Sequence, residues 1–312
     1  MTPARRPVAA AEVLADSLAP HGGRLTTFRV RYPLVVDREV LTHRALSRNG
    51  ASTRALRTEA MADSAEADPF VPDVWRSRGK GMQPAGELDP AAAAEAEAVW
   101  RGMVAATLEG VRRLAALGLA KELAGRPLEW FSYTTKIITS AGMRHFHALR
   151  GCGLAQREVG LLSRAMSEAA DASVPRRLRP GEWHLPLVDG ADREDAVAAT
   201  SGDHAVRPDL VARFPYLPAT DADAMLVLVS AARCARVSYL PPQGAARDRV
   251  AELGLADRLS RDGHASPFEH QATPDERATD HQDSPWLSPH RHGNLAGWLQ
   301  ARKYLEGEFT PG

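Results

Sequence analysis

Alternating apolar and polar residues predict a β-strand at residues 24–33, RLTTFRVRYP, where β-branched and aromatic side chains are frequent. A second strand is predicted at 129–140, EWFSYTTKIITS, on the same grounds. Between the two strands, residues 34–46 space their apolar side chains as one face of a helix. The strongest helical pattern covers residues 89–118, where Asp89 is placed to cap the first turn.

Helical spacing continues in the second half of the chain. It predicts two helical pieces at 141–170, broken near Gly151 and Gly153, and further helices at 221–240, 247–263 and 294–308. Residues 264–274 are predicted as a strand or turn, and the aperiodic segments at about 60–90 and 171–220 as long loops. Together these elements predict an α/β (α+β) fold, with a mixed β-sheet flanked by helices.

Composition narrows the class of protein. The chain has 312 residues, of which 44% are hydrophobic, enough for a sizeable core in two ordinary domains or one large one. Lys plus Arg and Asp plus Glu are 39 each, and this zero net charge argues against polymeric nucleic acid as a partner. Two cysteines are too few for a disulfide framework, and no signal peptide or apolar run of about 20 residues is evident. We therefore expect a cytoplasmic protein without a membrane span.

Familiar catalytic motifs are missing from the sequence. It has no P-loop, no dinucleotide-binding glycine pattern after a strand, no G-x-S-x-G elbow and no Cys-x-x-Cys pair. The candidate chemistry must instead come from less common clusters of polar residues.

The densest cluster of hydrogen-bond donors is THRALSRNGASTR at residues 42–54. It contains His43, Arg44, Ser47, Arg48, Asn49, Ser52 and Arg54. Guanidinium groups match phosphate and carboxylate geometry, so this composition suits an anion with polar substituents, such as a nucleotide or a cofactor phosphate. A solvated helix end followed by a turn has the same composition, and composition alone does not separate the two.

Two further clusters favour a binding site in the same way. HASPFEH, residues 264–270, places histidines on either side of a Ser-Pro step and a glutamate, which indicates either a binding turn or an ordinary strand entry. In RHFHALRGCGLAQ, residues 144–156, His147 and Arg150 share one helix face. A buried Arg150 would need an anion or a polar ligand edge, whereas an exposed one would not.

The histidines near the C-terminus raise an alternative. His281, His290 and His292 lie in a Pro-bearing segment and could serve a metal-dependent hydrolase, although their spacing fits no standard zinc pattern. A solvated loop is the better interpretation. Cys152 beside Arg150 could be a nucleophile, but a small packed thiol is the simpler interpretation.

The clusters together resemble the flavin-dependent thymidylate synthase (ThyX) family. Its motif R-H-R-x-x-S-x-N-E-x-S-x-R-Y is similar to residues 42–54, and its H-x-S-P-F-E-H motif is matched in full by 264–270. Residues 231–239, AARCARVSY, resemble its A-A-R-V-S-Y segment, and 146–159, FHALRGCGLAQREV, its F-x-x-L-R-x-x-x-x-A-Q-x-E-I segment. The order of these motifs differs from that of common members, so the resemblance implies a circularly permuted member with a ThyX-like fold.

Several positions depart from the family motifs. Thr42 stands for the first Arg, Gly50 for the Glu and Ala55 for the Tyr of the longest motif. His145 occupies a position where the family usually has an Asn that touches flavin, and Leu154 replaces a common His. These departures weaken the expected flavin and nucleotide contacts at these positions, and they leave a non-catalytic flavin- or nucleotide-binding homologue as an alternative.

The resemblance assigns roles to individual residues. Flavin would be bound by His43, Arg44, Ser47, Asn49, His145, His264, Ser266 and Glu269. Ser52 and Arg54 would bind the substrate phosphate from a neighbouring subunit, and Arg150 would sit at the uracil edge as the catalytic residue.

The resemblance also implies an activity for a single catalytic domain covering residues 1–312. The expected reaction is reductive methylation at uracil C5 of dUMP, UMP or both, with FAD as cofactor and methylenetetrahydrofolate and NADPH as co-substrates. The chain is also a candidate for the branch of the family that acts on UMP in nucleoside-antibiotic pathways. The expected assembly is a homotetramer.

Overall fold

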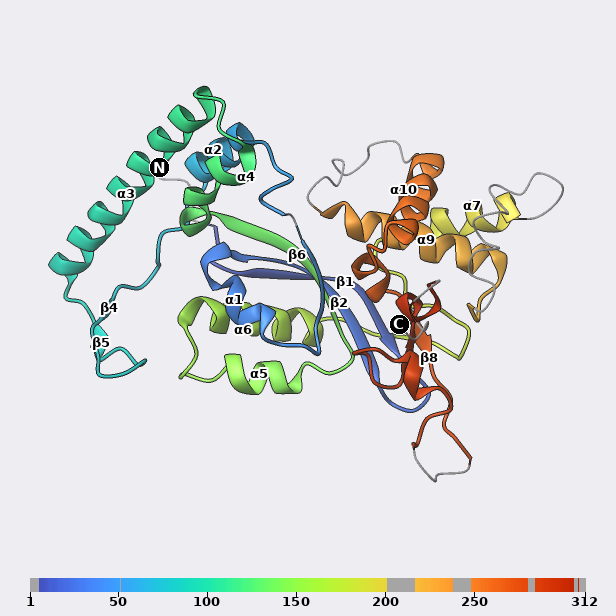
Figure 1. Ribbon diagram of the computed structural model, residues 1–312. Helices are drawn as coiled ribbons and strands as arrows, with labels where there is room; N and C mark the ends of the chain where they lie inside the picture. The colour runs from blue at the N-terminus through green and yellow to red at the C-terminus, as the bar shows by residue number, and fades with distance from the viewer. Residues whose placement is uncertain are drawn as a thin grey trace.

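A five-stranded mixed sheet forms the centre of the computed structural model, which describes residues 6–50, 52–200, 217–237, 248–279, 284–305 and 308. Its strands lie in the order β3-β6-β2-β1-β7 (Figure 1). In chain order they are β1 Ala10–Leu18, β2 Arg24–Pro33, β3 Ser47–Gly50, β6 Tyr133–Ser140 and β7 Arg176–Arg177. All neighbouring pairs are antiparallel except β1 and β7, which are parallel. The predicted mixed sheet flanked by helices is therefore confirmed.

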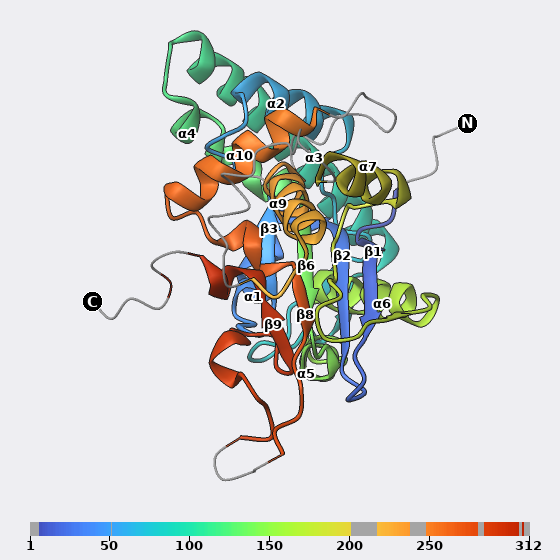
Figure 2. The same ribbon diagram turned by 90° about the vertical axis from the view of Figure 1, so that its right-hand side faces the viewer.

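The period-2 pattern of β2 decides which face of the sheet is apolar. Phe28, Val30 and Tyr32 are fully buried on one face, where they pack with Leu162 and Met166. Those two residues belong to α6 Arg157–Asp171, which covers this face together with α5 Arg144–Arg150 and α1 Asp37–Leu41 (Figures 1 and 2). The sequence predicted both the strand and the broken helix pair that covers it.

The longest helix lies at the outer edge of the molecule (Figure 1). This is α3 Pro90–Ala116, and the carboxylate of Asp89 caps it by accepting hydrogen bonds from the backbone N–H groups of Ala91 and Ala92 at 3.0 Å each. Only a narrow face of α3 is buried, and it packs against α2 Thr58–Ala67. The short α4 Lys121–Ala124 and a 3-10 turn at Arg126–Phe131 complete this layer.

The opposite face of the sheet is covered by elements from the second half of the chain (Figure 2). They are α7 Gly190–Thr200, α9 Asp221–Ala235, α10 Arg249–Arg261, a 3-10 turn at Ser266–Glu269, and the two-stranded sheet of β8 Ala272–Pro274 and β9 Trp298–Gln300. α9 is the central helix of this layer, because all its residues from 224 to 234 are buried. Thr220 caps α9 and Asp248 caps α10.

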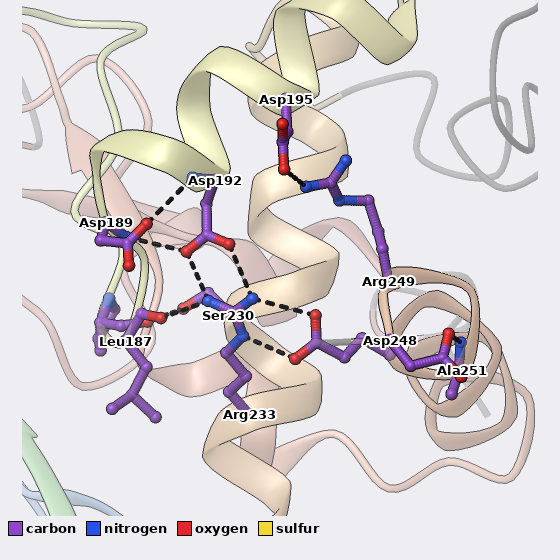
Figure 3. A network of polar contacts seen from close by, with 11 residues as sticks. Leu187, Asp189, Asp192, Asp195, Ser230, Arg233, Asp248, Arg249 and Ala251 are labelled. Carbon is purple, nitrogen blue, oxygen red and sulfur yellow. Dashed lines mark hydrogen bonds and ion pairs between the residues drawn. The ribbon is translucent and has the colours of Figure 1, made fainter. Parts of the chain in front are cut away.

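A buried ion-pair network holds the three helices of this layer together (Figure 3). Arg233 of α9 donates to Asp192 of α7 at 2.6 and 2.9 Å, and to Glu252 of α10 at 2.7 and 3.1 Å. It also donates to the carbonyl oxygen of Leu187 at 2.6 Å. All three charged side chains are nearly inaccessible to water, so each needs the others to remain charged in this environment.

Four sequence predictions differ from the structure. The predicted loop at about 60–90 begins with most of α2, because Met61, Ala62 and Ala65 bury a helical face against α3. It continues as a small hairpin of β4 Arg76–Ser77 and β5 Gly86–Glu87. The helix predicted at 34–46 stops at Leu41.

The predicted loop at about 171–220 contains β7 and α7, and residues 201–216 lie outside the described part of the chain. The final helix predicted at 294–308 is wrong. That segment forms β9 and a 3-10 turn, because Trp298 and Gln300 point into buried surroundings from a strand paired with β8. Within the described residues, no helix combines the length and apolar character needed to cross a membrane.

Candidate functional site

Arg150 and His43 meet although 107 positions separate them in the sequence. The Nε of Arg150 donates to Nε2 of His43 at 2.9 Å, and its Nη2 donates to Thr42 Oγ1 at 3.1 Å and to the carbonyl oxygen of Glu39 at 3.3 Å. Since a guanidinium can only donate, His43 accepts at Nε2 and carries its proton on Nδ1. The end of α5 is thereby fixed against the turn after α1.

The electrostatics of this contact keep His43 neutral. Burial lowers the pKa of His43, and the positive charges of Arg150 and Arg48 lower it further. The His43 ring also packs edge-on against Phe146, with the ring centroids 4.9 Å apart, and lies 6.3 Å from the ring of His145. A neutral, immobilised imidazole is a fixed acceptor that orients the guanidinium of Arg150.

A cavity of about 580 Å³ opens beside Arg150. Its walls come from Glu39 of α1, the β4–β5 hairpin and the junction between α5 and α6. Within the described residues, Nη1 of Arg150 has no hydrogen-bond partner, and Oε2 of Glu39 is buried without one. The cavity therefore has a cationic donor in Arg150 that is free to bind a ligand, and a lining residue, Glu39, with one buried carboxylate oxygen that has no partner.

A second group of candidate residues joins the edge strand β3 to the turn Ser266–Glu269. In the amide orientation that satisfies both of its ends, Asn49 Nδ2 donates to the carbonyl oxygen and to Oγ of Ser266, at 3.2 Å each. Gln300 donates to the carbonyl oxygen of Glu269 at 3.0 Å and to Ser47 Oγ at 3.4 Å. The motif segments 42–54 and 264–270 thus lie side by side.

Two neighbouring residues strengthen this junction and were missed from the sequence. Asn294 Nδ2 donates to Ser47 Oγ at 3.0 Å, and Gln300 donates to Asn294 Oδ1 at 3.0 Å. Ser47 is fully buried, so its hydroxyl is committed to these amides in this structure. Both amide residues lie in the segment predicted as the final helix, and a strand there would have placed Gln300 on the same face as Trp298.

A continuous row of buried polar side chains starts at the last residue of HASPFEH. His270 Nδ1 lies 2.8 Å from Thr139 Oγ1, which lies 2.6 Å from Thr27 Oγ1. Thr27 Oγ1 in turn lies 2.8 Å from His184 Nε2, and the other ring nitrogen of His184, Nδ1, lies 2.8 Å from Ser17 Oγ. We call these five residues the polar chain. Burial lowers the pKa of both His184 and His270 to about 3, so both imidazoles are neutral at physiological pH.

The structure brings some of the predicted site residues together and leaves others apart. Arg150, His43 and His145 form one group, and Ser47, Asn49, Ser266 and Glu269 form the other. Glu269 is further paired with Arg302. Among the described residues no contact joins the remaining predicted residues, all of them exposed, to either group: Arg44, Ser52, Arg54 and His264.

Two departures from the family motif have a local explanation. A Cβ added at Gly50 would come within 2.6 Å of the Lys136 side chain, whose Nζ is paired with Asp37 at 2.6 Å. A glutamate at position 50 would therefore need Lys136 to move. Thr42 accepts a hydrogen bond from Arg150, whereas an arginine at position 42 would bring a second guanidinium beside it.

The C-terminal histidines do not assemble into a metal centre within the described residues, where no group of three potential ligands occurs. His292 uses both ring nitrogens internally, with Nε2 at 2.8 Å from Asp275 Oδ2 and Nδ1 accepting from the backbone of Gly297 at 3.1 Å. His281 lies outside the described residues, as do Ser238 and Tyr239 of the third motif.

Part of the chain is similar to a known protein family. Residues 24–176 match the model of the family described as "Thymidylate synthase complementing protein". The expected family resemblance is confirmed. The thymidylate synthase complementing match covers about half of the chain and includes both His43 and Arg150. It does not include residues 264–270, so a circularly permuted order of motifs stays a prediction.

Among solved structures, similar chains include two of the UMP/dUMP methylase PolB from Streptomyces cacaoi. The one bound with 5-Br UMP has a TM-score of 0.44 and 20% identity, and covers 53% of this chain and 89% of its own. The one bound with 5-Br dUMP has a TM-score of 0.44 and 18% identity, and covers 53% of this chain and 90% of its own. A search of curated protein sequences found no match.

Proposed function

We propose that the protein is a flavin-dependent methyltransferase that reductively methylates uracil C5 of UMP, dUMP or both. The observation that carries the proposal is the contact between Arg150 and His43, which joins two separate family motifs and leaves one side of the guanidinium, which lines the cavity, free. The family match over residues 24–176 supports a methyltransferase that makes thymidylate-type nucleotides.

Arg150 would act on the uracil ring through its charge. C5 of uracil is a weak nucleophile, and loss of the N3 proton shifts electron density onto the ring oxygens, N3 and C5. A guanidinium fixed beside the ring stabilises that anion, and its stabilisation needs no reorganisation because His43 and Thr42 already hold it. Glu39 also lines this cavity, and its carboxylate would be the acceptor for the N3–H of the neutral ring if the buried Oε2 turned toward the ligand.

The chemistry of the available donors fits FAD. Arg44, His145, His264 and Ser266 are exposed and could bind phosphate or the polar edge of a flavin. Ser47, Asn49 and Glu269 tie the edge strand to the HASPFEH turn and would hold that surface in place. When bound, FAD would supply the redox chemistry, with methylenetetrahydrofolate as carbon source and NADPH as reductant.

The test is to incubate FAD-loaded protein with methylenetetrahydrofolate and NADPH, and with UMP and dUMP in separate reactions. Mass spectrometry of the nucleotide should find one added methylene unit with at least one of the two substrates. The Arg150→Ala protein serves as the control. Flavin binding without any methylated product would favour the non-catalytic homologue, and absence of flavin binding in an equilibrium titration would contradict the proposal.

A further inference from the structure

The β4–β5 hairpin forms one wall of the cavity beside Arg150 and is fastened to the opposite wall at two points. Arg157 at the start of α6 pairs with Asp73 through two hydrogen bonds of 2.9 and 2.6 Å. The side chain of Gln83 donates to the carbonyl oxygen of Leu154 at 2.9 Å. The hairpin thus forms a strap along the cavity that is held just before β4 and again in the turn between β4 and β5.

Trp75 is the large aromatic side chain of this wall. Its ring meets that of Trp100 edge-on, with centroids 5.9 Å apart and planes at 70°, and its backbone oxygen accepts from the N–H of Leu88 at 2.8 Å. Trp100 is itself fixed by a hydrogen bond of 2.8 Å to the carbonyl oxygen of Phe70. Trp75 is therefore positioned by Trp100 and by the backbone contact with Leu88, and its side chain is only partly buried.

The lining of the cavity combines apolar and polar side chains. Pro72, Val74 and Pro84 are the apolar companions of Trp75, and the polar side chains that can donate or accept hydrogen bonds include Arg150, Gln156 and Glu158. A ligand that suits this arrangement is flat, with apolar ring faces and a polar edge that both accepts and donates hydrogen bonds. An imide edge, in which one N–H lies between two carbonyl groups, has this pattern.

We propose that Trp75 is the stacking residue for the uracil ring of the nucleotide substrate, and that the strapped hairpin controls how fast the nucleotide leaves. This inference rests on the proposed function. Stacking on an aromatic side chain is tolerant of the sugar, so Trp75 should strengthen the binding of UMP and dUMP alike. Arg150 would act on the charge of the same ring in the transition state.

The decisive measurement is the dissociation constant of UMP and of dUMP, determined by calorimetry on the FAD-loaded protein. Trp75→Ala should weaken both by ~10- to ~100-fold, which is the usual effect of removing one stacking partner. Trp75→Phe should lie between that variant and the wild type. Trp130→Ala is the matched control, because Trp130 is 63% exposed and lies outside the cavity lining, and it should bind as the wild type does.

Steady-state kinetics separate stacking from a general loss of structure. Trp75→Phe should raise KM more than it lowers kcat, because stacking is present before the chemical step, whereas Arg150→Ala should chiefly lower kcat. UMP should quench tryptophan fluorescence in the wild type and lose that effect in Trp75→Phe. The strap is tested with Asp73→Asn, which should increase the nucleotide dissociation rate in stopped-flow measurements.

The outcomes distinguish the stacking role from the proposed function. If Trp75→Ala is folded and binds UMP and dUMP as tightly as the wild type, the stacking role is overturned even when methylation proceeds. If the nucleotides bind with the expected dependence on Trp75 but no methylated product forms, the stacking role stands and the proposed function fails. Unchanged quenching in Trp75→Phe would overturn the stacking role even if Trp75→Ala does not fold.

Discussion

At the scale of single residues, the contact between Arg150 and His43 combines two properties that a catalytic guanidinium needs. One side of the group is fixed by Nε and Nη2, and the other side is left for a ligand. A lysine at position 150 would keep the charge but not the planar fork that holds this geometry.

Arg150→Ala should lower the single-turnover rate of methylation by ~100- to ~1,000-fold, the usual loss when one pre-organised electrostatic group is removed. Flavin should remain bound, and Arg150→Lys should recover the rate only in part. Rapid-quench methylation beside a flavin titration checks this. A wild-type rate in Arg150→Ala would remove the residue from the mechanism, and loss of flavin would make it a structural residue.

The two histidines of the polar chain should make stability depend on pH. In the folded protein burial lowers their pKa from the ordinary value of 6.5 to about 3, so the unfolded chain binds more protons between these values. The free energy of unfolding should therefore not depend on these histidines above pH ~6.5. Below that pH, each histidine should lower the free energy of unfolding by about 1.4 kcal/mol per pH unit until the pH reaches about 3.

Urea unfolding at a series of pH values measures this slope, and His184→Gln isolates it. That variant keeps groups for hydrogen bonding to Thr27 and Ser17 but cannot take up a proton in this range. Its free energy of unfolding should fall less steeply with acid than that of the wild type, by about 1.4 kcal/mol per pH unit. Equal slopes in both proteins would show that His184 takes up its proton without unfolding.

At the scale of elements, the sequence predicted what local periodicity determines. The bounds of β2 match the predicted strand at 24–33, and the break between α5 and α6 lies where Gly151 and Gly153 indicated. The error at 294–308 arose because the same apolar residues fit a helix or a short strand, and only the pairing of β9 with β8 decides between them. Sequence motifs likewise identified Arg150 and His43, but their contact depends on how α5 and α1 pack, which no local pattern contains.

The helices of the second half depend on Arg233, and its removal should be costly. Arg233→Met would remove the buried guanidinium with which Asp192 and Glu252 are both paired (Figure 3), a change that should lower the free energy of unfolding by about 4 kcal/mol. Arg249→Met is the matched control on the same helices, since its partner Asp195 is 62% exposed. That change should cost less than ~1 kcal/mol.

Denaturant unfolding of both variants at neutral pH measures the difference. A loss that is as small in Arg233→Met as in Arg249→Met would mean that the two carboxylates gain protons or water without disturbing the helices.

At the scale of the whole molecule, the two motif groups belong to one body. The polar chain and the contact between Asn49 and Ser266 both join the central sheet to the C-terminal layer, which supports the proposal of a single catalytic domain. Ser52 and Arg54 are nevertheless exposed, and among the described residues no hydrogen bond joins either side chain to Arg150. A site that uses all three is consistent with the predicted homotetramer, in which a neighbouring subunit supplies the phosphate contacts.

Mixing two inactive variants tests whether subunits share a site. Arg54→Ala and Arg150→Ala should each have little activity alone, and random co-assembly should restore activity in roughly a quarter of the sites, where each residue comes from an intact neighbour. Activity assays after co-refolding, with light scattering to measure the assembly, check this. A mixture that stays inactive although the subunits have mixed would place Arg54 and Arg150 of one chain in the same site or remove Arg54 from it.

The polar chain has only two complete arrangements of its protons. Each hydroxyl can donate once, so if Thr27 donates toward His184, then Thr139 must donate toward Thr27, and His270 must carry its proton on Nδ1. If Thr27 donates toward Thr139 instead, both imidazoles carry their protons on Nε2. The two histidines therefore always share one tautomer. The direction of every hydrogen bond in the polar chain, which crosses β1, β2 and β6, follows from that one tautomer. Nε2 of His270 is buried and has no partner within the described residues. A donor or acceptor that reaches this atom would select one tautomer, and the choice would change which atom donates in the hydrogen bond between His184 and Ser17, without any movement of the backbone.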